Sequence, residues 1–570
     1  MKKITFGIPE EFVPSKYCKA LAYHETPIQY DIENIEFGVT SKGCRLQFPI
    51  SENEQIYGFG LQLKEFNHRN RRLRLQVNSD PVAATGGSHA PVPFFVTTKG
   101  YGVYIDTARN IDVCCGMQKK RFRAQEEMEK AEVKLTTEEL YAHVKNGDMS
   151  FLVVDIPAAK GVDIYIFEGD TITDVVAQYN MFSGGGPDVP EWGLGVLYRA
   201  YGRSTEMDIK ELAEYFERND MPVDTIGFEP GWQSASYPCT YAWNQDNFPH
   251  YKETIAFLKQ KGYHINLWEH AYVRAGSPLY AQLYDLSGDY EVWNGLVPDF
   301  SLSEARTIFA QYHKRNFTDR GIDGFKLDEC DGSDFCGSDW CFPNCAAFPS
   351  GLDGEQYHHL FGTLYMQTIM EALSGNKTLS EVRSAGALCA SYPFVLYSDL
   401  YDLPDFVRGV VNAGFSGILW TPEVRHAKTK KEFLRRLQAN VFSCQCIINA
   451  WYCEDVPWKN LDCEKEVKEL LHLRKSLVPM LKQAFDKYRD TGIAPIRALV
   501  SDYSDDENTF EIDNEYIFCD NFIVCPMPID GDEREVYLPQ GHWCDFWTKK
   551  SVNSGKFTIT TENIPVFQKI

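Results

Sequence analysis

The chain contains regions with two different periods of hydrophobic and polar residues. Over residues 1–188, short runs such as 102–106 and 163–167 alternate apolar and polar positions, and glycines and charged turns separate them. Because successive side chains of a strand point to opposite faces, this alternation predicts strands that each bury one face. We therefore expect an N-terminal β-sandwich over residues 1–188.

From residue 189, strand-like apolar runs alternate with amphipathic stretches. In residues 206–218, for example, Met207, Ile209, Leu212, Ala213 and Phe216 roughly keep helical spacing. The expected strands are residues 193–198, 224–229, 264–270, 324–328, 378–383, 395–399, 417–420 and 446–450. Eight strands that alternate with helices predict an α/β fold, a closed (β/α)8 TIM barrel over residues 189–488.

The last part of the chain returns to short strands. Residues 464–488 read as one long helix that closes the barrel, and Gly492 follows it. Beyond that glycine, the runs 508–513, 535–539 and 541–547 alternate again. We expect a C-terminal β-sandwich over residues 489–570.

Polar and aromatic residues follow many of the predicted barrel strands. In parallel α/β folds the carboxyl ends of the strands carry the chemistry, so these residues are candidates for a site. A single one, such as Asp328 after the run 324–327, fits a helix cap equally well. A ring of them is hard to explain structurally, and its members are Glu229, Trp268, Glu269, His270, Asp328, Arg383, Asp399, Trp420 and Glu423.

Composition narrows the function classes. The chain has 570 residues, 44% of them hydrophobic, and a formal net charge of -23. Nucleic acids and anionic membranes bind clustered Lys and Arg, so we expect neither as a partner. Aromatic residues make up 14% of the chain, which suits the binding of sugars as well as core packing. The sequence leaves a monomer and a homo-oligomer equally open.

The N-terminal residues and the cysteines both bear on the cellular compartment of the protein. The start has a basic pair without the apolar segment of a signal peptide, and no run is long enough to span a bilayer. We expect a cytoplasmic protein whose 17 cysteines are mostly reduced. Cys330, Cys336, Cys341 and Cys345 form a denser group, but without a CxxC pair they predict loop thiols rather than a metal site. The loop after Asp328, which runs to about Gly351, has the length of a functional rim or lid.

Two aspartates on neighbouring strand ends suit glycoside hydrolysis. One carboxylate attacks or stabilises the anomeric carbon, and the other donates a proton to the departing oxygen. The proton donor needs a dry or anionic setting, because its pKa must lie near the working pH. We expect such a setting around Asp399. A carbohydrate-binding protein on an inactive barrel is the competing class.

The motifs around these residues resemble glycoside hydrolase family 31, the retaining α-glucosidases and α-xylosidases. The run 325–328 (Phe-Lys-Leu-Asp) is followed 71 residues later, 399 minus 328, by the run 397–399 (Tyr-Ser-Asp). Arg383 lies in a Val-Arg-Ser segment ahead of the second aspartate, and the likeness extends through residues 192–195, 247–249, 473–479, 492–497 and 536–543. Nearly the whole chain is covered.

The resemblance implies roles for the site residues. Asp328 would be the nucleophile and Asp399 the acid/base, and Trp268, Lys326 and Arg383 would contact the sugar in the innermost subsite. It implies no metal and no cofactor. From their place after the second and seventh predicted strands, we expect further contacts with the glycoside or oligosaccharide substrate from Glu229, Trp232, Trp420 and Glu423.

The departures from the family pattern concern specificity. Family α-glucosidases have Asp-Ile-Asp after the second strand, whereas residues 229–231 here are Glu-Pro-Gly, so the second carboxylate is missing at Gly231. Pro422 replaces the family's histidine after strand seven, and Leu396 its tryptophan before the acid/base. A lost hydrogen-bond partner changes which epimer a site accepts. We expect a retaining exo-α-glycosidase of the α-glucosidase type, with α-galactosidase, α-xylosidase or transglycosylase activity as alternatives.

Overall fold

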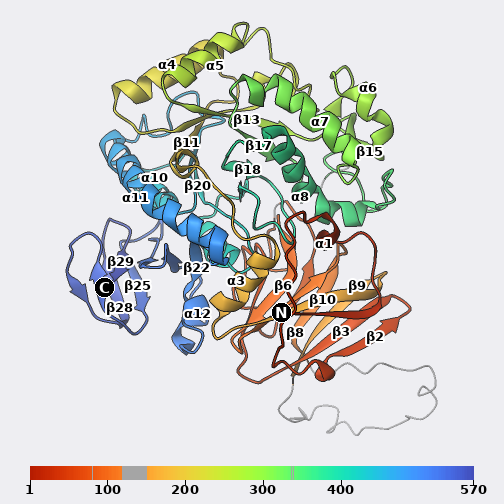
Figure 1. Cartoon of the computed structure of the whole chain (residues 1–570). Helices are drawn as coiled ribbons and strands as arrows, with labels where there is room; N and C mark the ends of the chain where they lie inside the picture. The colour runs from red at the N-terminus through yellow and green to blue at the C-terminus, as the bar shows by residue number, and fades with distance from the viewer. Residues whose placement is uncertain (80, 118–149, 335–336, 338) are drawn as a thin grey trace, which may run out of the picture.

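Three regions follow one another along the chain (Figure 1). The computed structural model describes residues 1–570 except 80, 118–149, 335, 336 and 338. An N-terminal pair of sheets is followed by a ring of parallel strands with helices outside it, and a smaller pair of sheets carries the C-terminus. The predicted architecture is therefore confirmed.

The N-terminal region is a sandwich of two five-stranded antiparallel sheets. Leu46 and Val154 of one sheet and Val103 and Ile164 of the other bury their side chains in a common core, because alternate residues of each strand face inward. One sheet contains β1 (Lys2–Ile8), β10 (Lys160–Glu168), β7 (Tyr101–Asp106), β6 (Pro91–Thr97) and β4 (Ile56–Gly60). The other contains β2 (Glu36–Thr40), β3 (Gly43–Ile50), β9 (Ser150–Pro157), β8 (Ile111–Met117) and β5 (Arg72–Leu75).

The helix α3 (Ile172–Phe182) joins the sandwich to the barrel. Thr171 and Asp174 form a capping box at its start, in which each side chain accepts the backbone N–H of the other. Its buried face packs on β6, β7 and β10, so the sandwich is fixed beside the barrel.

The barrel sheet has eight parallel strands. Its order is β19 (Phe394–Leu396), β18 (Ser380–Val382), β17 (Gly324–Asp328), β13 (His264–His270), β12 (Thr225–Phe228), β11 (Val196–Arg199), β21 (Cys446–Asn449) and β20 (Glu423–Val424). An isolated parallel bridge between Leu396 and Trp420 joins the two ends of this order. Consecutive strands are neighbours, so the residues after β12, β13, β17, β18 and β19 meet at one end of the ring.

Helices cover the outside of the ring and alternate with its strands (Figure 1). They are α4 (Glu206–Arg218), α5 (Tyr251–Gln260), α7 (Ser303–Asn316), α8 (Gly354–Leu373), α9 (Leu403–Ala413), α10 (Lys430–Val441) and α11 (Glu464–Thr491). In α4, Thr205 and Asp208 form a capping box, and Ile209, Ala213 and Phe216 are the buried apolar face. The expected long helix is confirmed as α11.

The seventh strand differs from the expectation. Residues 417–420 contribute the single bridge at Trp420, and the paired strand is β20, three residues later. Gly417 has a φ of +68°, a left-handed conformation that ordinary strands do not contain. The apolar run therefore forms a buried irregular segment, and the paired strand starts at Glu423.

The C-terminal region contains a six-stranded and a two-stranded sheet. The first is β22 (Ile496–Ala498), β23 (Tyr516–Phe518), β24 (Phe522–Val524), β29 (Val566–Lys569), β26 (Trp543–Asp545) and β27 (Ser551–Val552), and the second is β25 (Glu533–Leu538) with β28 (Gly555–Thr560). The expected strand at 508–513 is wrong, because Asp506 accepts the backbone N–H of Asn508 and begins the 3-10 turn Glu507–Thr509.

Two insertions surround the carboxyl end of the ring. A small antiparallel sheet of β14 (Val273–Arg274), β16 (Gly295–Pro298) and β15 (Ser287–Val292) follows β13. The described part of the segment between β17 and α8 lies beside it, because Ala347 and Asp289 exchange hydrogen bonds. Among the described residues, no helix is long and apolar enough to cross a membrane.

Candidate active site

A cavity of about 320 Å³ lies at the carboxyl end of the barrel strands. Both candidate aspartates line it, together with Glu229, Trp268, Lys326 and Arg383 of the residues expected from the sequence. The other lining residues are Ser79, Pro230, Tyr237, Glu329, Asp331, Gly332, Trp340 and Trp451. Side chains from the ends of β12, β13, β17, β18 and β19, from the segment after β21 and from the N-terminal region therefore meet around one space.

Asp328 is the last residue of β17. Its Oδ2 accepts a hydrogen bond from Trp268 Nε1 at 2.7 Å, and its Oδ1 accepts one from the backbone N–H of Glu329 at 2.9 Å. These two donors fix the carboxylate in the cavity. Lys326, two residues earlier, points to the same face of the strand, and its Nζ lies 4.6 Å from the centroid of the Tyr397 ring.

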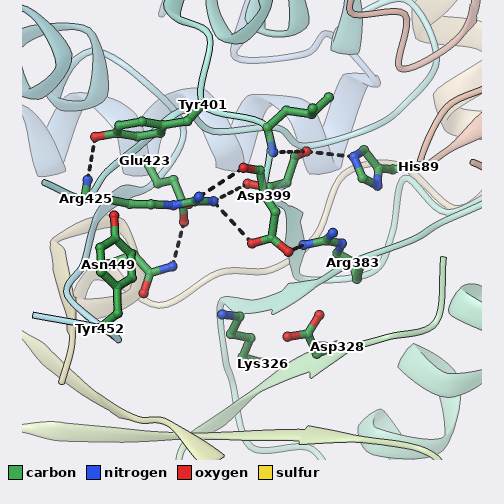
Figure 2. Close-up of polar contacts among 12 residues, drawn as sticks. His89, Lys326, Asp328, Arg383, Asp399, Tyr401, Glu423, Arg425, Asn449 and Tyr452 are labelled. Carbon is green, nitrogen blue, oxygen red and sulfur yellow. Dashed lines mark hydrogen bonds and ion pairs between the residues drawn. The ribbon is translucent and has the colours of Figure 1, made fainter. Parts of the chain in front are cut away.

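Asp399 follows β19 and lies between two guanidinium groups, as Figure 2 shows. Arg383 Nη1 is 2.8 Å from its Oδ2, and Arg425 Nη2 is 3.4 Å from its Oδ1. The side chain is 60% exposed to the cavity. Desolvation by the surrounding atoms opposes ionisation, but the charges of Arg383, Arg425 and Lys326 outweigh it and hold the pKa of Asp399 well below its usual range.

This cationic setting contradicts the dry or anionic one expected around Asp399. The reason is the second arginine, which comes from the segment after β20 and could not be placed from the sequence. Arg425 also donates to the backbone carbonyls of Ser398 at 2.7 Å and Asp399 at 3.0 Å. The two guanidinium groups therefore favour the ionised form of Asp399.

A buried chain of contacts supports the two aspartate loops from the N-terminal sandwich. His89 Nδ1 lies 2.9 Å from Asp331 Oδ2, and His89 Nε2 lies 2.8 Å from Ser398 Oγ. The same Asp331 oxygen accepts a hydrogen bond from Arg383 Nε at 2.8 Å. His89 thereby connects the loop after β17 with the residue before Asp399.

Glu229 reaches the cavity from a buried ion cluster inside the ring. Arg199 is fully buried and pairs with Glu229 and Glu381, and it also donates to Asn266 Oδ1 at 2.9 Å. The other oxygen of Glu229 is 3.7 Å from Lys326 Nζ. The guanidinium sets the position of Glu229, and Glu229 in turn sets that of Lys326.

Three of the expected substrate contacts lie away from the cavity, so we correct them. Trp232 is buried and donates its Nε1–H to the Trp268 carbonyl at 2.7 Å, behind the cavity wall. Trp420 is buried and donates to the Phe406 carbonyl at 3.1 Å. Glu423 pairs with Arg425 and accepts a hydrogen bond from Asn449 Nδ2 at 3.0 Å, so it contacts Asp399 only through Arg425.

The sequence analysis missed several residues of the site. Tyr237, Trp340 and Trp451 are 45%, 52% and 42% exposed, and all three line the cavity. They lie in loops, where no hydrophobic period exists to place them. For Glu329 the sequence does offer one signal. A carboxylate directly after Asp328 has to lie at the same end of the strand as Asp328.

The missing carboxylate at position 231 has a packing reason. The backbone N–H of Gly231 donates to the Gly202 carbonyl at 3.0 Å. A Cβ atom added to Gly231 would lie 2.3 Å from that oxygen, closer than any real contact. Any side chain at this position would push apart the loops after β11 and β12.

Further cavities and cysteine side chains lie outside this site. Among the residues that the structure describes, no three His, Cys, Asp or Glu side chains gather as metal ligands. Cys330 is buried and Cys345 is exposed, both as free thiols. Cys341 is buried, and Cys336 lies outside the described residues. A larger cavity of about 500 Å³ lies between α9 and the C-terminal sheets, and neither aspartate lines it.

Family comparisons cover all three regions. The Glycosyl hydrolases family 31 TIM-barrel domain matches residues 186–484, and the Glycosyl hydrolase family 31 C-terminal domain matches residues 492–570. The Glycosyl hydrolase 31 N-terminal galactose mutarotase-like domain matches residues 22–113.

Individual relatives are distant. The chain is 25% identical over 445 residues to alpha-glucosidase 2 of Bacillus thermoamyloliquefaciens, which covers 72% of this chain and 56% of that protein. It is 22% identical to an alpha-xylosidase of Saccharolobus solfataricus, over 91% of this chain and 70% of that one. The chain thus spans just over half the length of the first of these relatives.

Solved structures share the fold. A Flavobacterium johnsoniae dextranase complexed with glucose has a TM-score of 0.77 and 19% identity, over 95% of this chain and 68% of that one. A cycloalternan-forming enzyme from Listeria monocytogenes, in complex with a pentasaccharide substrate, has a TM-score of 0.76 and 20% identity, over 93% and 53%.

Proposed function

The chain belongs to glycoside hydrolase family 31, and from this premise we propose that it is a retaining exo-α-glycosidase that removes terminal sugars from short oligosaccharides. One observation carries the proposal. Asp328 and Asp399 line the same cavity at the carboxyl ends of neighbouring barrel strands. Two carboxyl groups that can reach one sugar are what double displacement requires.

The proposed reaction has two steps. Asp328 forms a bond to the anomeric carbon while the bond to the leaving oxygen breaks, and Asp399 gives that oxygen its proton. Asp399 then removes a proton from water, and the water oxygen displaces Asp328 from the sugar. Because Arg383 and Arg425 favour the ionised form of Asp399, its pairing with them must loosen when a glycoside enters and a proton is taken up.

The substrate proposal is an α-glucoside. The alpha-glucosidase among the relatives supports it, and so does the neutral, aromatic-lined cavity wall of Trp268, Tyr237 and Trp340. The absence of a carboxylate at Gly231 argues for a glucoside preference that differs from maltose. Rates on aryl α-glucosides, α-xylosides and α-galactosides would rank the alternatives.

The test of the activity is Asp328→Ala. We expect the wild-type protein to release aryl alcohol from an aryl α-glycoside with retention at the anomeric carbon, and the variant to lose turnover by a factor of at least about 10⁴. Asp339→Asn is the matched control, because Asp339 is an exposed carboxylate in the same loop. Undiminished hydrolysis by Asp328→Ala would reject the assignment.

Transglycosylation is a second candidate, favoured by the exposed aromatic residues at the cavity mouth. Trp340 packs on Trp293 with ring centroids 5.1 Å apart, and Trp451 lies at the end of β21. Such surfaces bind an acceptor sugar in place of water. Product analysis at high substrate concentration distinguishes the two outcomes, since only transfer yields products longer than the substrate.

We also propose a cytoplasmic location without nucleic-acid partners. Most cysteines that the structure describes are buried thiols, which fits a reducing compartment. The net charge of -23 opposes binding to nucleic acid. Fractionation of cells that express a tagged chain tests the location.

A further inference from the structure

Glu329, the residue directly after the proposed nucleophile, has an unusual backbone. Its φ is +53°, in the left-handed region that few residues other than glycine adopt. Two contacts hold it there: its N–H donates to Asp328 Oδ1 at 2.9 Å, and its carbonyl accepts from Tyr272 Oη at 2.8 Å. Backbone strain that is fixed so firmly is typical of a functional position, because it aims a side chain.

The side chain of Glu329 points into the cavity. It is one of the lining residues, and its Oε1 accepts a hydrogen bond from Tyr237 Oη at 3.1 Å. The Tyr237 ring is itself held against Trp268 and Trp293, with centroids 5.5 and 4.8 Å away. Within the described part of the chain, Oε2 has no hydrogen-bond partner, so it is available to a ligand.

The charges around Glu329 favour its neutral form. Burial raises the pKa of Glu329 to about 9, and the carboxylates of Asp328 and Asp331 add to the shift, while Arg383 and the Tyr237 hydroxyl oppose it. The titratable and charged groups that face it from the packed elements are Asp328, Asp331, Arg383, Tyr237, Tyr272 and Cys239. At neutral pH the site therefore offers an O–H donor beside the proposed nucleophile.

A purely structural role does not account for these contacts. An ion pair would explain a buried glutamate, but no lysine or arginine of the described residues lies within 4.0 Å of its carboxyl oxygens. A cap would explain the left-handed turn, but the side chain accepts a tyrosine hydroxyl and no backbone N–H. The carboxyl group lines the same cavity as Asp328 and Asp399.

We propose that Glu329 is a substrate-binding residue that donates a hydrogen bond to an oxygen of an uncharged sugar in the innermost subsite. The inference rests on the proposed function only for the identity of the ligand. It also accounts for the glycine at position 231: the carboxyl group that the family places after the second strand is excluded there by Gly202, and Glu329 brings one in from β17.

The test is equilibrium binding of D-glucose, D-xylose and D-galactose by calorimetry, at pH 7 and pH 10. Glu329→Gln keeps a donor and cannot ionise, so we expect its Kd to stay within about threefold of wild type at pH 7 and to remain unchanged at pH 10. The wild-type Kd should rise about tenfold at pH 10, one unit above the pKa. Glu329→Ala should weaken binding at least about tenfold at both.

The controls separate this inference from the proposed function. Asp339→Asn, on the same loop, should bind as wild type does at both pH values, and circular dichroism of each variant checks that it is folded. Sugar binding with no turnover would reject the hydrolase and leave the role of Glu329 standing. Wild-type affinity in Glu329→Ala, or a wild-type protein that binds none of the three sugars, would overturn the inference.

Discussion

The neutral state of Glu329 predicts a pH-dependent stability difference that can be measured without any substrate. The usual glutamate pKa is 4.5, and the folded protein raises that of Glu329 to about 9. The stabilising contribution of its proton is complete below pH 4.5 and is lost as the pH rises toward 9, because only the unfolded chain releases the proton in that range. Glu329→Gln removes this loss.

The magnitude follows from the shift. Each pH unit above 4.5 is worth about 1.36 kcal/mol for one proton, so the shift corresponds to roughly 3 kcal/mol at pH 7. Glu329 is half-buried and keeps some contact with solvent, so about 2 kcal/mol is a reasonable lower figure after screening. We expect Glu329→Gln and wild type to be equally stable near pH 4.5, and the variant to be more stable by about 2–3 kcal/mol at pH 7.

Urea unfolding followed by tryptophan fluorescence at pH 4.5, 6 and 7.5 measures this difference. The slope against pH matters more than any single value, because a new contact made by the glutamine would shift all three points equally. Asp339→Asn, an exposed substitution on the same loop, is measured in parallel as the control. A constant difference between pH 4.5 and 7.5 would refute a neutral Glu329, whatever the sugar-binding result.

Two further predictions concern the ion pairs of the site. Arg199→Met leaves Glu229 and Glu381 buried without their cation and should lower the free energy of unfolding by roughly 3–5 kcal/mol in urea, and Arg199→Met with Glu229→Gln should recover part of that loss. Asp399→Ala should slow the cleavage of unactivated disaccharides by roughly 10²–10⁴. It should affect aryl glycosides with acidic leaving groups far less, because these need little protonation, and kcat/KM against leaving-group pKa shows the difference; an equal loss on both would contradict the acid role.

The sequence predicted the fold well because the barrel strands are short, buried and regularly spaced. The run 324–328 could be read as a strand ending in a carboxylate, and β17 has those bounds. The secondary-structure predictions failed where the hydrophobic period of the sequence carries no information about the backbone. Residues 508–513 alternate like a strand, but the Asp506 side chain turns the backbone into a 3-10 helix.

The site was predictable only for residues attached to strand ends. Trp268, Lys326 and Asp328 lie on or at the end of a barrel strand, so their position follows from the strand. Trp232 and Trp420 were misassigned because a large aromatic residue after a strand fills the core as readily as it lines a cavity. Arg425 could not be found, since its contact with Asp399 depends on how two loops fold across the ring.

The position of His89 has a practical consequence for anyone who dissects this protein. A fragment trimmed to residues 186–484 would keep every barrel strand and both aspartates, yet it would lose the imidazole between Asp331 and Ser398. In the excised barrel, water would have to replace the contacts that His89 makes with Asp331 and Ser398. The smallest unit of this protein that keeps both contacts is therefore larger than the barrel and includes the N-terminal sandwich.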